Sequence, residues 1–230
     1  MQRREMLKAT GALAGLAALA SGSSAEDRPA KTALKFSNAD FYGPDGTFLV
    51  DKAKEAVVKL CEYHGFPMFP GFCDSLWIAD YGIGRYAELG LAAYMYVNNT
   101  EDRYMLMDIF LLPNQMLPEH WHVEGEGHEA KREGWLVRCG LSHIVGIGEP
   151  NLGQDVVIPK CHCKVTTEHE VPATPGMFVP LAKVETRHWQ LAGPEGAIIT
   201  EVATVHTNSA VRHTDPVLNE HFLASVKAAK

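Results

Sequence analysis

The chain has 230 residues, 46% apolar content and a formal net charge of −7, as expected of a globular protein with one domain or two small ones. The negative charge argues against a surface for nucleic acid or an anionic membrane, because both need clustered Lys and Arg. Five irregularly spaced cysteines do not form a disulfide framework in a chain of this length.

The first 25 residues have the layout of an export signal. Arg3 and Arg4 precede a short apolar run from Ala9 to Ala20, and Ser-Ser-Ala ends at Ala25. This run is too short and too rich in Ala and Gly to span a bilayer stably. The arginine pair resembles a twin-arginine signal, with a Sec signal or a retained lipid-surface anchor as alternatives. We predict an exported, periplasmic protein, or a cytoplasmic one if the leader is not processed.

Residues 26–89 are expected to form an arm and a helix that packs on the main domain. After a polar stretch, the segment 47–64 repeats apolar residues at helical spacing. Thr47 is placed to cap the start of this helix, and Gly65 with Pro67 to end it.

Residues 90–230 predict a barrel of antiparallel strands that ends in a helix. Apolar runs with aromatic residues recur at short spacing, with Gly, Pro and Asn between them, as in a barrel or a sandwich. The runs are 90–99, 103–113, 134–149, 155–167, 176–181, 188–193 and 196–207. In the last segment, Asp215 suits a helix N-cap and Pro216 the first helical position.

A metal-binding pattern begins with two histidines at alternate positions. His120 and His122 face the same side of a strand, so both imidazoles can reach one metal ion. Glu133 follows, with Gly140 seven residues on, and His188 comes much later on a second hairpin. This arrangement resembles the two motifs of cupins, small barrels whose ligands face the interior. The fold class is therefore all-β: a cupin-like antiparallel β-barrel of jelly-roll type, with flanking helices at both ends.

Five glutamates within residues 118–135 compete for the role of carboxylate ligand. Glu119 alternates with the histidines and should face away from them. Glu133 opens a strand and can point into the barrel. The others lie in a Gly-rich loop, where solvation is expected: Glu124, Glu126 and Glu129. Three imidazoles and one carboxylate suit Mn, Fe, Ni or Zn and leave positions open for substrate.

Other histidines and cysteines carry weaker signals. Cys161-His162-Cys163 looks like half of a zinc site, but no second Cys pair completes it, so two residues on one face of a strand is the simpler interpretation. Seven other histidines are expected to be structural or at the surface: His128, His143, His162, His169, His206, His213 and His221.

Longer stretches resemble the D-lyxose isomerase family of cupin sugar isomerases. They are ADYGIG (79–84), YMYVNN (94–99), LPEHWH (117–122), KREGWLVRCG (131–140), TRHWQLAGPEGAIITE (186–201) and TDP (214–216). The resemblance covers about residues 79–218 and leaves out 26–75. It implies a homodimer and a divalent metal, usually Mn²⁺, with Zn²⁺, Fe²⁺, Co²⁺ or Ni²⁺ as alternatives. The implied metal ligands are His120, His122, Glu133 and His188.

The resemblance also implies catalytic and substrate-binding residues. Lys131 and Glu201 would be catalytic, and Asp215 and Gln190 would contact the sugar. An aldose–ketose isomerase moves a proton between C1 and C2 through an enediolate, whose charge a divalent metal would stabilise. Glu201, with a pKa raised by burial, could carry the proton, and Lys131 could stabilise the charged oxygen. A hydride shift would need the metal but not the base.

Simpler roles remain open for these residues. Glu201 could be a salt-bridged strand residue, Lys131 a solvated loop lysine, and Asp215 a helix cap only. The expected function is isomerisation of a free sugar. D-Lyxose, which would give D-xylulose, and D-mannose are the expected substrates. Clusters of Arg or Lys that would bind a phosphorylated sugar are not found in the sequence. A cupin oxygenase and a non-catalytic, exported carbohydrate-binding cupin are the alternatives.

Overall fold

The computed structural model describes residues 32–125 and 127–228. The chain divides into two units, Met1–Thr32 and Ala33–Lys230, and every element below belongs to the second. The predicted export leader, residues 1–25, lies outside the described residues, and the predicted domain boundary at residue 90 stays a prediction. Neither α-helix in the described part of the chain has the length and apolarity needed to cross a membrane.

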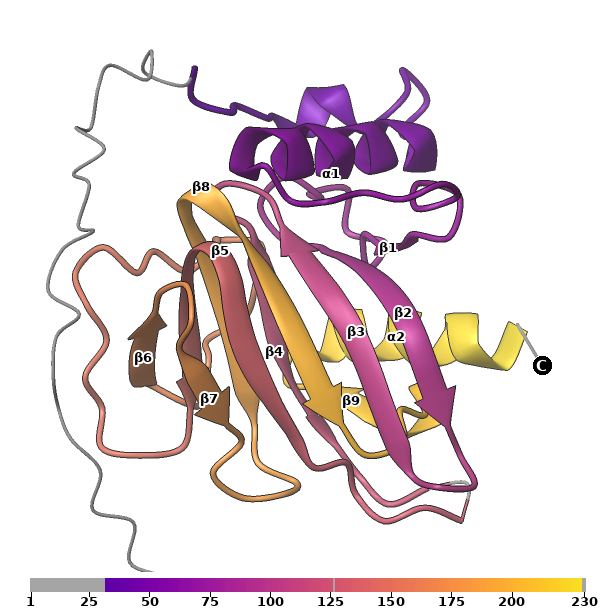
Figure 1. Ribbon diagram of the computed structural model, residues 1–230, viewed down its shortest axis with the longest axis vertical. Coiled ribbons are helices and arrows are strands. Elements are labelled where there is room, and N and C mark those ends of the chain that lie inside the picture. Colours follow the sequence, from indigo (N-terminus) through magenta and orange to yellow (C-terminus); the bar gives the residue numbers. More distant parts are fainter. Residues whose placement is uncertain (1–31, 126, 229–230) are drawn as a thin grey trace, which may run out of the picture. The chain divides into compact units, whose positions relative to one another are not determined.

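One curled antiparallel sheet dominates the described residues (Figure 1). Its core path runs β1-β2-β3-β8-β4-β9, and β5 pairs with β6, β7 and β8. The strands are β1 (Trp77–Ala79), β2 (Leu91–Asn99), β3 (Tyr104–Leu111), β4 (Met116–His122), β5 (Glu133–Gly146), β6 (His169–Ala173), β7 (Phe178–Pro180), β8 (His188–Ala203) and β9 (Val211–His213). The predicted all-β, cupin-like barrel with helices at both ends is confirmed.

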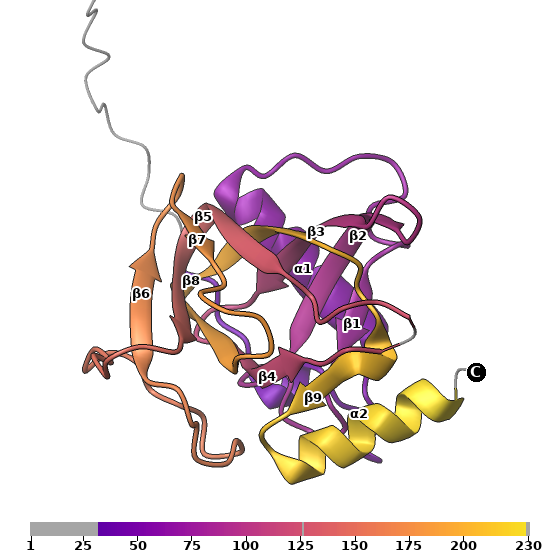
Figure 2. The ribbon, with the colours of Figure 1, turned by 90° about the horizontal axis from the view of Figure 1, so that it is seen from below.

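The sheet curls because β8 is shared between two sets of partners. Residues 188–191 of β8 pair with β4, residues 197–203 pair with β3, and β5 runs along both halves. Gly140 of β5 and Gly196 of β8 meet at the bend, with φ of 73° and 77°. A Cβ on Gly140 would lie 2.0 Å from the Gly196 carbonyl oxygen, so only glycine allows this approach. Figure 2 shows the strands arranged around a common interior.

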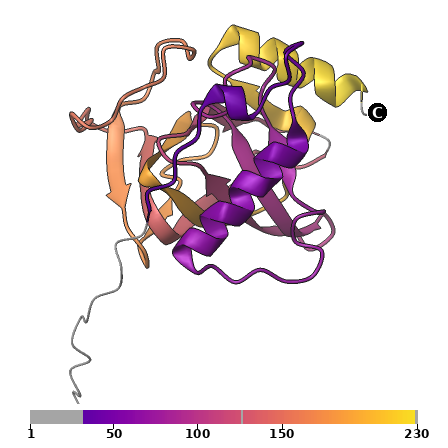
Figure 3. The same ribbon diagram turned by 90° about the horizontal axis from the view of Figure 1, so that it is seen from above.

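Helix α1 (Val50–His64) covers one end of the barrel (Figure 3). Val57 and Leu60 of this helix are fully buried, as the helical spacing predicted. The helix ends at Gly65 in a left-handed conformation, also as predicted. Its N-cap is Leu49 rather than Thr47, which belongs to the preceding turn, where its N–H donates to the Asp45 side chain.

Helix α2 (Pro216–Ala228) follows β9 directly. The Asp215 carboxylate accepts hydrogen bonds from the backbone N–H groups of Val217 at 2.9 Å and Leu218 at 3.4 Å, which makes Asp215 the cap that the sequence indicated. Leu218 and Phe222 bury the inner face of α2 against the barrel core. Two short 3₁₀ turns, η1 (Asn38–Asp40) and η2 (Asn208–Ala210), complete the elements.

Two strand predictions are wrong. The segment 155–167 forms a loop, because its backbone donors find carboxylates instead of a neighbouring strand. The N–H of Thr167 donates to Glu119 at 2.8 Å, and the N–H of Cys163 donates to Asp215 at 2.8 Å. The runs predicted on either side of residues 194–195 are the single strand β8.

Candidate metal centre and pocket

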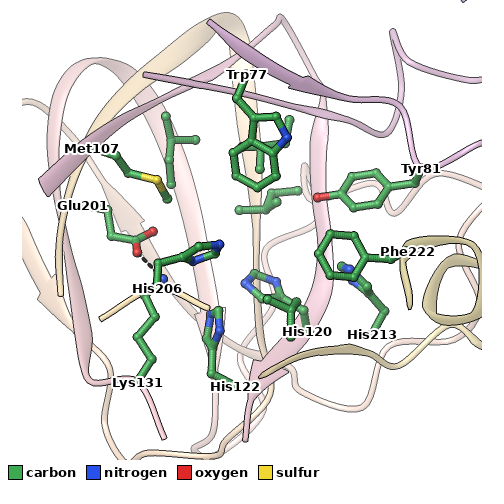
Figure 4. Close-up of a pocket in the computed structure, with 14 residues that line it drawn as sticks. Trp77, Tyr81, Met107, His120, His122, Lys131, Glu201, His206, His213 and Phe222 are labelled. Carbon is green, nitrogen blue, oxygen red and sulfur yellow. Dashed lines mark ion pairs between the residues drawn. The ribbon is translucent and has the colours of Figure 1, made fainter. Parts of the chain in front are cut away.

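A pocket opens inside the barrel between the strands and α2 (Figure 4). Strands β3, β4, β8 and β9 supply much of its wall, and α2 contributes one aromatic ring. Its lining includes several residues that the sequence singled out and several that it did not. The lining residues are Trp77, Tyr81, Leu91, Met107, Ile109, Leu117, His120, His122, Lys131, Glu201, His206, Val211, His213 and Phe222.

Three predicted metal ligands converge here; His120 and His122 line this pocket, and His188 lines a second one. His120 and His122 share one face of β4, and His188 of β8 lies directly across from His120 in the strand register. One ligand atom from each histidine lies within 4.8 Å of the others. The Nδ1 atoms of His120 and His188 donate to the backbone carbonyls of Pro118 at 2.8 Å and Thr186 at 3.0 Å. These bonds leave Nε2 as the ligand atom of both rings.

Glu133, at the start of β5, completes a set of four donors. Its Oε1 lies 3.5 Å from Nε2 of His122 and 3.3 Å from Nε2 of His188. These three atoms are buried, with no hydrogen-bond partner among the described residues. Leaving a buried polar atom unsatisfied costs about 1–3 kcal/mol, so their convergence needs an explanation. A divalent ion provides one, and three nitrogens with one oxygen fit Mn, Fe, Ni or Zn.

The electrostatics of the three histidines favour metal binding. Burial lowers the pKa of His120 and His122 well below the ordinary value, and lowers the pKa of His188 to about 4. Each ring is therefore neutral at pH 7. Neutral imidazole is the form that binds a metal, so the site does not have to lose a proton from these rings first.

Lys131 and Glu201 form a buried ion pair beside the histidines. The Lys131 ammonium lies 2.9 Å from Glu133 Oε2 and 2.5 Å from Glu201 Oε1. Burial opposes the charge on Lys131, but the two carboxylates outweigh this and raise its pKa. Burial raises the pKa of Glu201, which Lys131 opposes only in part. The indole N–H of Trp135 donates to the other Glu201 oxygen at 3.3 Å. Lys131 is thus buried rather than solvated.

Two other predicted residues lie outside the pocket lining. The Asp215 carboxylate accepts hydrogen bonds from the backbone N–H groups of α2 and of Cys163. Burial alone would raise its pKa, but these bonds outweigh burial and lower it. Gln190 is fully buried, and its side-chain oxygen accepts a hydrogen bond from Ser142 at 3.1 Å. The structure therefore does not bring Asp215 or Gln190 to the pocket with the histidines.

Sequence reasoning missed two histidines of the lining, His206 and His213. Burial lowers the pKa of each to about 4, so both are neutral at pH 7. His206 Nε2 lies 2.8 Å from the Asn208 side-chain oxygen, and its Nδ1 has no partner among the described residues. His213 lies opposite His120 in the register of β4 and β9. A three-residue strand leaves no periodic signal that could have predicted this placement.

A second cluster of ligand types lies where the 155–167 loop meets α2. Atoms of His162, Cys163 and Asp215 lie within 4.8 Å of one another. Unlike the first cluster, its atoms have protein partners: His162 Nδ1 donates to the Cys163 carbonyl at 2.7 Å, and Nε2 accepts from the Glu119 N–H at 3.3 Å. Hydrogen bonding explains the proximity without a metal.

Fold and site together define a β-barrel protein with a buried cluster of histidines and carboxylates. The fold is similar to that of solved L-ribose isomerases. The enzyme of Cellulomonas parahominis matches with a TM-score of 0.55 and 10% identity, over 78% of this chain and 96% of that one. The enzyme of Acinetobacter sp. DL28 matches with a TM-score of 0.56 and 12% identity, over 80% and 97%.

Sequence comparison identifies the family more closely. No protein-family model matches the chain. The chain is 32% identical over 166 residues to the D-lyxose ketol-isomerase of Cohnella laeviribosi, covering 72% of this chain and 90% of that protein. It is 30% identical over 168 residues to the D-lyxose/D-mannose isomerase of Thermosediminibacter oceani, covering 73% and 91%. The chain belongs to the D-lyxose ketol-isomerase family and is an isomerase.

Proposed function

We propose that the protein is a metal-dependent aldose–ketose isomerase that converts a free sugar, such as D-lyxose or D-mannose, into its ketose. Glu201 carries this proposal. It is a buried carboxylate with a raised pKa, and it lines the same pocket as His120 and His122 of the histidine cluster. Proton abstraction next to a carbonyl needs a base whose pKa lies closer to neutral than that of an exposed glutamate.

In the proposed reaction, Glu201 removes the proton from C2 of the open-chain aldose and returns it to C1. Removal of the C2 proton leaves an enediolate with one negative charge, which moves from O1 to O2 as the O2 proton passes to O1; protonation of C1 then gives the ketose. The Lys131 ammonium, held by Glu133 and Glu201, adds fixed positive charge on this side of the pocket. His120, His122, Glu133 and His188 would hold a divalent ion, for which we propose Mn²⁺. When bound, it supplies further positive charge beside those oxygens.

The lining of the pocket favours a neutral sugar over a sugar phosphate. Lys131 is the one Lys or Arg among the described residues of the lining, and two carboxylates already pair with it. A phosphate group would need further cations or a row of free backbone N–H groups. Apolar and aromatic side chains such as Trp77 and Phe222 instead offer faces for the C–H surface of a sugar ring.

The test uses the chain without residues 1–25, loaded with Mn²⁺. Lyxose, mannose and ribose are followed by NMR in deuterated water. We expect a ketose to appear from at least one of them, with deuterium entering at C1 or C2. A metal-loaded protein that converts no aldose would overturn the proposed function. Ketose formation without deuterium would keep the isomerase and replace the proton transfer by a hydride shift.

Two variants separate the proposed roles of the carboxylates. Glu201→Gln should bind the metal as the parent protein does and lose at least about a hundredfold in turnover, the usual scale for a positioned acid or base. Trp135→Phe removes one hydrogen bond to the same carboxylate and should lower turnover far less. If both variants lose turnover equally, Glu201 is not the base.

Export and dimerisation are further proposals that rest on the sequence. We propose that the leader, residues 1–25, directs the protein to the periplasm through the twin-arginine route. Replacing Arg3 and Arg4 by Lys should retain the protein in the cytoplasm, which cell fractionation measures. A homodimer is proposed from the family resemblance, and sedimentation of the chain without its leader tests it.

A further inference from the structure

His213 is a buried side chain whose two ring nitrogens are left unused by the described part of the fold. Only 4% of the residue is exposed, and neither ring nitrogen has a hydrogen-bond partner among the described residues. Its backbone is fixed on both sides, since β9 pairs with β4 and the His213 N–H donates to the Asn219 side chain at 3.0 Å. These contacts fix the direction in which the side chain leaves the backbone. The ring lines the pocket, with two unsatisfied atoms at its wall.

The aromatic residues around His213 cannot satisfy its nitrogens. The rings of Tyr81 and Phe222 meet the imidazole edge to face, with centroids 5.2 Å away in each case. His120, its strand neighbour, has its ring centroid 5.8 Å away and commits Nδ1 to the Pro118 carbonyl. A neutral imidazole offers one donor and one acceptor, which is also what an alcohol offers. A hydroxyl group in the pocket is thus a matching partner.

Tyr81 delivers a second polar group to the same place. Its hydroxyl points into the pocket beside His213 and Phe222 (Figure 4). The residue adopts φ of 55°, which a bulky side chain rarely does and which costs about 1–3 kcal/mol. Asp80 fixes this turn, because its carboxylate accepts from the Gly82 N–H at 3.1 Å and from the Tyr42 hydroxyl at 3.2 Å. The strained backbone conformation of Tyr81 places its phenol in the pocket wall.

The pocket therefore has two polar ends. Glu201 and Lys131 lie on one side of His120 and His122, and Tyr81 and His213 lie on the other (Figure 4). The proposed proton transfer uses only the first end, so the second is left without a role in the chemistry. A sugar held at its C1–C2 end near Glu201 extends the rest of its carbon chain towards the second end.

We propose that His213 and Tyr81 form a specificity subsite that hydrogen-bonds sugar hydroxyls remote from the reacting carbons and so selects which aldose is converted. The inference rests on the proposed isomerase function and deepens it. Neither residue takes part in the proton transfer. Their effect falls on the choice among sugars that differ beyond C2.

The test compares D-lyxose with its 4-deoxy and 5-deoxy analogues in the Mn²⁺-loaded protein. The parent protein should favour D-lyxose over at least one analogue by about tenfold in kcat/KM, the worth of one good hydrogen bond. His213→Leu should bring that ratio close to one, mainly by raising KM for D-lyxose. His213→Gln, which keeps a donor and an acceptor, should restore part of the ratio. Tyr81→Phe should lower the preference for one of the two hydroxyls.

The outcomes separate this inference from the proposed function. If the parent protein converts no aldose, the isomerase proposal fails, and the same ratios are then measured as sugar affinities by calorimetry. An unchanged ratio in His213→Leu, in turnover or in affinity, overturns the subsite. A purely structural role would lower the values for all three sugars equally and leave the ratio intact. Metal content and melting temperature of each variant show whether the barrel has survived.

Discussion

Two clusters in this protein bring ligand atoms within 4.8 Å of one another, yet they differ in whether those atoms have hydrogen-bond partners. His120, His122 and His188 meet inside the barrel, while His162, Cys163 and Asp215 meet where the 155–167 loop joins α2. Nitrogens of the first cluster face Glu133 without hydrogen-bond partners, whereas the second donates to and accepts from the backbone around it. Proximity of ligand atoms alone therefore does not define a metal site. Converging lone pairs without hydrogen-bond partners are the stronger indication of one.

The largest expected effect is the loss of Glu133. Glu133→Gln removes the carboxylate that faces His122 and His188, so metal affinity should fall by more than the roughly 10–100-fold typical of outer-shell partners, and turnover should fall with it. Metal analysis after gel filtration measures the affinity. Glu129→Gln, the same change at an exposed loop position, is the matched control and should keep the metal. Full metal retention by Glu133→Gln would remove Glu133 from the site.

Acid should destabilise the metal-free protein through the first cluster. The pKa of His188 is about 4 when folded and about 6.5 when unfolded, so the unfolded chain binds more protons between these values. Stability should be full above pH 6.5 and fall as the pH drops to 4, by about 1.4 kcal/mol per unit for each such histidine. Urea unfolding at several pH values measures this slope. His188→Gln should have a shallower slope, and an equal slope would contradict the buried, neutral ring.

The second cluster should affect stability and not metal binding. Asp215→Ala removes the cap of α2 and should lower the free energy of unfolding by about 0.5–2 kcal/mol, with metal content unchanged. Asp215→Asn keeps a capping oxygen and should lose less, which thermal melts can compare. Strong loss of turnover in Asp215→Asn without loss of stability would instead support the contact with the sugar that the family resemblance implied.

The smallest effect is expected at Cys163. Its thiol donates a long bond of 3.6 Å to the Lys164 carbonyl and lies beside the Asp215 carboxylate, contacts that a serine hydroxyl can also make, so Cys163→Ser should change stability by less than about 0.5 kcal/mol. Metal content per chain should also stay the same. Loss of a second equivalent of zinc in this variant would show that the two clusters are alike after all.

The convergence of the proposed ligands could be predicted because local rules govern it. Strand alternation places His120 and His122 on one face and turns Glu119 to the other, where its carboxylate accepts from Thr166 and Thr167. The glycine seven residues after Glu133 marks the bend at which β5 meets β8. These features depend on a few adjacent residues, so they can be predicted from the sequence alone.

The rest of the site depends on contacts that no local pattern reveals. His213 reaches the pocket only because a three-residue strand pairs with β4. The 155–167 segment has the composition of a strand, yet distant carboxylates such as Glu119 take its backbone donors. Asp215 was ambiguous because a helix cap and a sugar contact require the same carboxylate, and only the pocket lining separates the two.

The turn at Asp80 also determines where new selectivity could arise. Its carboxylate is anchored by the hydroxyl of Tyr42, which itself accepts the backbone N–H of Tyr86 at 3.1 Å. Tyr42 lies in the segment ahead of α1, outside the stretches that resemble the family. A region outside the family resemblance thus holds the strained residue at the wall of the pocket. Substitutions in this arm could therefore retune the proposed sugar preference while every proposed ligand and catalytic group stays in place.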